Sequence, residues 1–127
     1  MNLAKKKFEK LDIYGYSLNR IRYESNASLS LYMSAPPDAS GKYRGFELQF
    51  LRVLGCIVNF TIEPWLGSIV SYEVTEISRE LKKALSGREV CQELGDYTVF
   101  SVSTDNGKIE IAARDYAYLE TKEILRY

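Results

Sequence analysis

The sequence contains no histidine. Catalytic triads built on imidazole, zinc sites that need histidine, and the commonest general base near neutral pH are therefore excluded. The glycines have neither the spacing of a phosphate-binding loop nor that of a dinucleotide fingerprint. We therefore predict a protein that is not an enzyme and that uses no cofactor and no metal.

Cysteine and long apolar runs are also scarce. Cys56 and Cys91 are the only cysteines, and they lie too far apart in sequence for a structural zinc site. In a reducing compartment two such residues are expected to be separate thiols. No stretch approaches the roughly 18 apolar residues of a membrane span, and the lysine-rich start is not followed by the apolar segment of a signal peptide. We expect a cytoplasmic protein with no membrane partner.

The chain has no excess of either charge, since 17 basic residues balance 17 acidic ones. Without an overall field, a nucleic-acid partner is disfavoured. What the chain does have is 46% hydrophobic residues within 127 residues, which is enough for one core and predicts a single domain over residues 1–127. Its ten tyrosines favour half-buried strands and binding faces.

Apolar and polar residues alternate in several segments, which indicates strands with one wet face. The alternation covers residues 29–33, 46–50 and 58–62. Gly55 lies between the last two and suits a tight reversal or a bulge, so we expect a hairpin there. Residues 12–24 change phase near Asn19 and Arg20, which predicts a bulge or a turn.

The strongest local signal is Asp105-Asn106-Gly107, because Asn-Gly is the preferred pair for a two-residue hairpin loop. We predict that Asn106 and Gly107 form the loop. That register places Asp105 opposite Lys108, Val102 opposite Ile111 and Phe100 opposite Ala113. It also places the apolar residues of both strands on one face.

The remaining segments complete the predicted architecture. Residues 35–41 and 64–67 contain proline and glycine and are expected to be loops. Apolar residues from Val74 to Leu85 recur every three or four positions, which predicts an amphipathic helix. The tail from Tyr116 is typical of either an edge strand or a short helical turn. The chain is predicted to be mainly β, an antiparallel sandwich or curled sheet of six to eight strands with one helix; a two-layer α+β sheet is the alternative.

Aromatic and basic side chains interleave near the start of the chain, and one tryptophan lies in a predicted loop. The candidate binding residues are Tyr14, Tyr16, Arg20, Arg22, Tyr23 and Trp65. Such a strand suits simple packing, a protein interface or a platform for single-stranded nucleic acid. The neutral charge favours the first two. Among the carboxylates, Glu63 beside Trp65 is the strongest candidate for catalysis, because an indole can raise the pKa of a neighbouring carboxyl by desolvation.

Two segments carry a resemblance to known proteins: residues 46–53, and the later pair of strands over residues 104–111. With the strand pattern over residues 43–115, they resemble small β-rich bacterial proteins of unknown function, some of which are immunity proteins encoded beside secreted toxins. The resemblance implies binding to another protein. It transfers no functional residue.

We therefore predict a non-catalytic binding protein whose partner is another protein or a second copy of itself. A toxin-neutralising role is one form of this prediction. The alternative is a small-ligand carrier whose interior pocket is lined by Phe46, Phe50, Phe60 and Trp65. A carboxylate-dependent hydrolase at Glu63 comes third, and it requires a second acid nearby.

Overall fold

The computed structural model describes residues 7–61, 65–85 and 97–121. Its strands form one antiparallel sheet in the order β1-β2-β3-β6-β5-β4, curled but not closed into a barrel. The predicted class, mainly β with a curled sheet, is confirmed. The strands are β1 (Ser17–Tyr23), β2 (Leu29–Ser34), β3 (Gly45–Phe60), β4 (Ile69–Thr75), β5 (Thr98–Thr104) and β6 (Gly107–Thr121).

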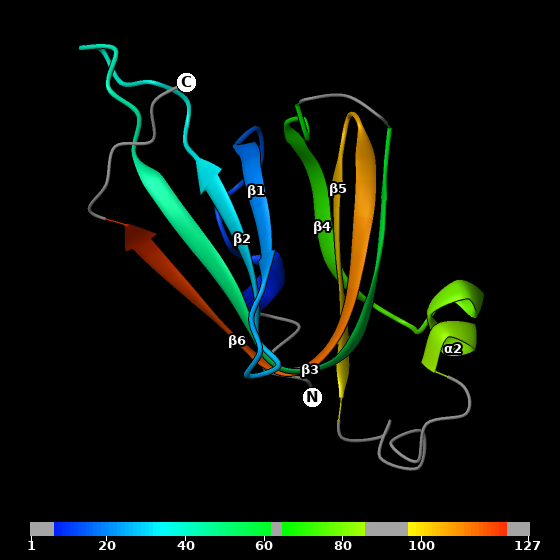
Figure 1. The fold of residues 1–127 in the computed structure, drawn as a ribbon. Coiled ribbons are helices and arrows are strands. Elements are labelled where there is room, and N and C mark those ends of the chain that lie inside the picture. The colour runs from blue at the N-terminus through cyan, green and yellow to red at the C-terminus, as the bar shows by residue number, and fades with distance from the viewer. Residues whose placement is uncertain (1–6, 62–64, 86–96, 122–127) are drawn as a thin grey trace.

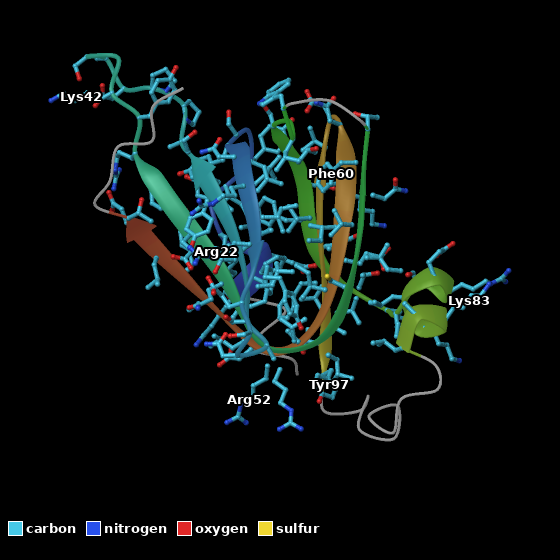
Figure 2. All side chains as sticks on the ribbon, viewed as in Figure 1. Arg22, Lys42, Arg52, Phe60, Lys83 and Tyr97 are labelled. Carbon is cyan, nitrogen blue, oxygen red and sulfur yellow. The ribbon has the colours of Figure 1, made fainter. Side chains whose placement is uncertain are left out.

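The sheet consists of two halves that share β3 and β6, its two longest strands (Figure 1). The first half contains β1, β2, residues 45–51 of β3 and residues 115–121 of β6. The second half contains β4, β5, residues 53–60 of β3 and residues 107–113 of β6. Both long strands bend at the corner between the halves. Arg52 lies at this corner (Figure 2) and has a positive φ of 53°. Phe50 before it and Val53 after it both face the core, so the alternation of faces shifts by one residue here.

The core lies between the two halves, and the N-terminal segment fills it. Residues 7–9 are helical, and their turn lies between the halves in Figure 1. Phe8 is fully buried, with its ring centroid 4.9 Å from that of Phe100 in the second half and 6.2 Å from that of Phe50 in the first. Ile13 is also fully buried in this cluster. The space inside the curl is therefore occupied by the chain's own side chains.

The helix α2 (Arg79–Leu85) packs on the outside of the second half. Its buried residues Leu81 and Leu85 contact a small cluster that includes Leu54. The prediction that the helix begins at Val74 is wrong. Val74 lies in β4, pairs with Phe100 of β5 and packs against the main core. The helix starts later, where the Ser78 hydroxyl accepts the N–H of Leu81 as an N-cap.

The expected hairpin at Gly55 is also wrong. Residues 45–60 form one continuous strand whose register shifts by a bulge between Val53 and Gly55. A Cβ atom at Gly55 would lie 2.6 Å from a terminal methyl carbon of Leu85, so glycine lets α2 pack close to the strand here. The phase change predicted near Asn19 is confirmed as a bulge between Leu18 and Arg20 in β1.

The last hairpin exists, but its register differs by two residues from the prediction. Thr104 pairs with Gly107, Val102 with Ile109 and Phe100 with Ile111, so Asp105 and Asn106 form the loop. Bonds to the segment before β4 account for the difference. Asp105 accepts the N–H of Ser68, and the Asn106 side chain donates to the carbonyl of Trp65. The shift is even, so the predicted faces are preserved.

The end of β6 and the lengths of the helices complete the description of the fold. Residues 116–121, whose sequence is typical of either an edge strand or a helical turn, continue β6 as a strand. Within the described ranges, no helix is both long enough and apolar enough to cross a membrane.

Candidate functional site

The outermost strands of the sheet, β1 and β4, meet at one end, and we call this contact the seam. The N–H of Gly15 donates to the carbonyl of Ile69, and the N–H of Ile69 donates to the carbonyl of Tyr16. The N–H of Leu18 donates to the carbonyl of Gly67, and Ser17 forms an isolated bridge with Ser68. The seam joins the two halves of the sheet opposite the corner at Arg52.

Three exposed apolar side chains are attached to the seam or next to it. Tyr14 is 68% exposed and precedes Gly15, while Val70 is 43% exposed and follows Ile69, the residue bonded to Gly15. Trp65 is 50% exposed, and its carbonyl accepts a hydrogen bond from the Asn106 side chain. We call these three residues the seam patch. Backbone hydrogen bonds hold the residues next to Tyr14 and Val70, and a hydrogen bond from the Asn106 side chain holds the main chain at Trp65.

The structure therefore separates the six predicted binding residues into groups. Tyr14 and Trp65 belong to the seam patch. Arg20 and Arg22 are exposed on the outer face of the first half, where Arg20 lies 4.5 Å over the ring of Tyr32 and Arg22 forms an ion pair of 2.6 Å with Glu24. Tyr23 is exposed at the far end of β1. Because of the bulge in β1, these residues do not form one continuous platform.

Tyr16, the sixth predicted residue, is half-buried in an aromatic cluster at the rim of the first half. Its ring lies 5.4 Å from Phe46, which stacks on Tyr118 with an interplanar angle of 5°. Burial, together with the neighbouring Tyr16, raises the pKa of Tyr118 well above its ordinary value. Tyr118 therefore stays neutral at physiological pH, and both tyrosines make packing contacts with Phe46 here.

The same rim carries a paired arginine. Arg44 donates two hydrogen bonds of 2.8 and 2.7 Å to the Glu120 carboxylate, and its guanidinium lies 5.5 Å from the centre of the Phe46 ring. This pairing lowers the pKa of Glu120. Arg44 is thus already engaged by a carboxylate of its own chain, and the pair extends the surface beside Tyr118.

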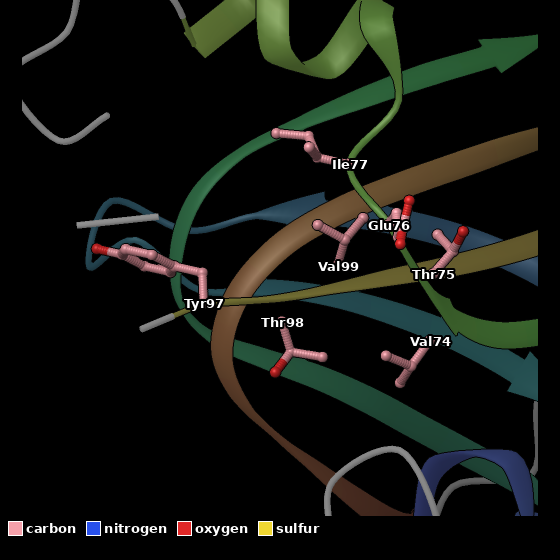
Figure 3. A pocket seen from close by; sticks show the side chains of 7 residues that line it. All are labelled: Val74, Thr75, Glu76, Ile77, Tyr97, Thr98 and Val99. Atoms are coloured by element: carbon pink, nitrogen blue, oxygen red, sulfur yellow. The ribbon is translucent and has the colours of Figure 1, made fainter. Parts of the chain in front are cut away.

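A pocket of about 400 Å³ lies elsewhere, where β4 and β5 separate beyond their last paired residues. In Figure 3, Ile77 and Val99 lie on one side of the strands and Val74 and Thr98 on the other, while Tyr97 is at the strand end. Thr75 and Glu76 complete the lining. The aromatic residues predicted to line a carrier's interior do not line this pocket, and Phe46 and Phe50 are buried in the core.

The candidate reactive groups are placed as follows. Glu63, the residue considered for hydrolysis, and Cys91 lie outside the described residues. Glu110 is nearly buried and lies 3.2 Å from Lys108. Cys56 is half-buried in β3, and burial raises the pKa of its thiol. Among the described residues, no group of three or more cysteines, aspartates and glutamates is arranged to hold a metal ion.

Comparison with protein-family models, curated proteins and solved structures gives no significant match for this chain. The candidate site therefore rests on geometry alone. Sequence reasoning identified Tyr14 and Trp65 but missed Val70. Val70 lies at the register shift between Ile69 and Ser71 in β4, so a simple alternation of faces along the strand does not point to it.

Proposed function

We propose that this protein is a non-catalytic binding protein that recognises another protein through the seam patch. One observation carries the proposal: Tyr14 and Val70 expose apolar side chains next to residues bonded across the seam, and Trp65 exposes its ring where the Asn106 side chain holds its carbonyl. Aromatic residues on a rigid base are favourable interface anchors, since little conformational entropy is lost when they are covered.

The neighbouring groups suit a protein partner. The Arg44–Glu120 pair and the Tyr16 cluster provide a polar and aromatic rim on the first half of the sheet. Interfaces commonly combine an apolar centre with such a rim. Neutralisation of a toxin, as the sequence resemblance implies, is a specific form of the same proposal, and it requires that the partner be the product of a neighbouring gene.

The carrier hypothesis comes second. The space between the two halves, where its aromatic residues were expected to line a pocket, holds Phe8 and Ile13. A ligand in that space would have to displace side chains that pack both halves together. The packing of Phe50 against Phe8 therefore favours binding at the surface over binding inside.

The test is capture of partners under native conditions by the wild-type chain, by a Tyr14→Ala/Trp65→Ala variant and by a Tyr23→Ala control. Tyr23 is 57% exposed and lies at the far end of β1, so its loss removes a comparable aromatic surface away from the seam. We expect the control to retain every specific partner and the double variant to lose at least one, with binding weakened about a hundredfold or more.

Equal capture by all three chains would contradict the proposal. Loss of binding only in the control would move the interface to the outer part of β1. Circular dichroism and thermal unfolding of each variant show whether a loss of capture comes from misfolding.

A further inference from the structure

In the second half of the sheet, no described strand pairs with the side of β3 that faces away from β6. β3 pairs with β2 only over residues 45–50, and from Val53 onward its only partner among the described strands is β6. The N–H of Thr61 donates to the carbonyl of Asn106, so Thr61 and Asn59 direct their backbone groups toward β6. Cys56, Val58 and Phe60 therefore direct their N–H and C=O groups away from β6, toward the open side.

This edge lacks the usual protection against pairing. From Val53 through Ile62 no residue is charged and none is a proline. Val58 is 50% exposed and Asn59 is exposed as well. Free edges in soluble proteins are normally blocked by charges, prolines, bulges or covering elements, and a bare β-branched edge is a template for another strand. The bulge in β3 precedes the exposed part, and α2 packs against Leu54. Neither of these features blocks residues 56–60, and no other described strand pairs with them.

We propose that this edge binds the same edge of a second copy of the chain, which joins two sheets through antiparallel β3 strands around a two-fold axis at Val58. This interface is separate from the seam patch and does not depend on it. A two-fold axis perpendicular to the sheet places the inner faces of both copies on the same side of the joined sheet. Residues that lie opposite each other across the interface must therefore point to the same face. Val58 then faces Val58, and Cys56 faces Phe60 of the second copy.

The backbone pattern fits this arrangement. Every N–H and C=O that Cys56, Val58 and Phe60 direct outward finds a complementary group on the same three residues of the second copy. The small Cys56 side chain lies opposite the large Phe60 ring, and the exposed Val58 side chain becomes covered. Because the strand carries no charge, no like charges meet across the interface. A second copy is therefore a complementary partner for this edge.

The first experiment measures oligomeric state by sedimentation equilibrium over about a hundredfold range of protein concentration. It compares the wild-type chain, Val58→Lys and the control Val70→Lys, since Val70 is an exposed valine on β4. We expect a concentration-dependent dimer for the wild type and for the control. Two lysines directly opposed at the axis should raise the dimer dissociation constant at least about tenfold. A monomeric wild type, or a dimer insensitive to Val58→Lys, would overturn the proposal.

The second experiment tests register and does not depend on the lysine variant. In a chain with Cys56→Ser and Cys91→Ser, Val58→Cys places two thiols opposite each other at about 5.5 Å between Cα atoms, a separation that suits a disulfide. We expect mild oxidation to form a covalent dimer, and the matched Val70→Cys chain to remain monomeric. Equal cross-linking of both chains would refute the register. A monomeric wild type that pairs through Val58 only with a different protein would refute the second copy as the occupant.

The two proposals can fail independently. The Tyr14→Ala/Trp65→Ala variant should sediment as the wild type does, because its substitutions lie at the seam. Val58→Lys should still capture the partners of the seam patch.

Discussion

The curled sheet has two sides on which strand edges could stay open, and they differ in how they are closed. At the seam, β1 and β4 are joined by backbone hydrogen bonds, and the N-terminal segment packs behind them. On the other side, residues 56–60 of β3 pair with β6, and no other described strand pairs with them. β1 and β4 stand at the two ends of the strand order, but they are protected because they bond to each other at the seam. β3 stands inside the order, yet part of it has an edge that no described strand covers.

The largest expected effect concerns the residue that ties both halves together. Phe8→Ala removes a fully buried ring that contacts Phe50, Phe100, Tyr72 and Tyr116. We expect a loss of about 3–5 kcal/mol in the free energy of unfolding, because the cavity cannot collapse without moving one half of the sheet. Urea denaturation measures this loss. A change below about 1 kcal/mol would show that the N-terminal segment is not part of the stable core.

The next effect concerns the seam itself. Gly67 has a φ of +100°, and a Cβ atom there would meet the side chain of Asp105 and lie 2.8 Å from the Thr104 hydroxyl. We expect Gly67→Ala to destabilise the fold by about 1–3 kcal/mol through backbone strain and steric conflict. Gly41→Ala is the control, since Gly41 also has a positive φ but no neighbour within 4 Å of such an atom. Thermal unfolding should show the larger loss for Gly67.

A substitution at the exposed edge of β3 should change the stability of the monomer very little. At concentrations where the chain is monomeric, Val58→Lys is expected to change the free energy of unfolding by less than about 0.5 kcal/mol, because half of the Val58 side chain is already in water. Val102→Lys on β5 is the buried counterpart and should unfold the protein. A large loss of stability for Val58→Lys in the monomer would mean that the edge is covered within one chain.

The smallest effect is a pH dependence at the rim of the first half. Arg44 lowers the pKa of Glu120 in the folded chain, so the pair stabilises the fold above the unfolded pKa of that carboxyl. The contribution is lost as the pH falls through the folded pKa. Between about pH 5 and pH 3 the wild type should therefore lose slightly more stability than Glu120→Gln, whose side chain does not titrate. Identical pH profiles of melting temperature would contradict this account.

Much of the fold follows from local sequence signals, because alternation of apolar residues specifies which side of a strand faces the core. The strands at residues 29–33 and 46–50, the bulge near Asn19 and the final hairpin were all predictable on this basis. The register of that hairpin was not, because Ser68 and Trp65 select it from distant positions. The start of α2 was missed because Val74 suits both a helix face and a strand, and only Phe100 decides between them.

The candidate site was predictable only in part. Tyr14 and Trp65 stand out by residue type, but their association with the seam depends on hydrogen bonds between Gly15 and Ile69 and between Leu18 and Gly67. The exposed edge of β3 could not be predicted at all. The alternation over residues 58–62 places Val58 on the apolar face of a strand, and the exposure of its side chain follows from β2 ending its pairing at Phe50.

The corner at Arg52 has a consequence for how the molecule opens. Because β3 and β6 each run through both halves, neither half can lose its ladder without disturbing the main chain of the other. Amide protons on β3 before and after the corner should therefore exchange with solvent deuterium through the same global opening, so that the two halves behave as one cooperative foldon.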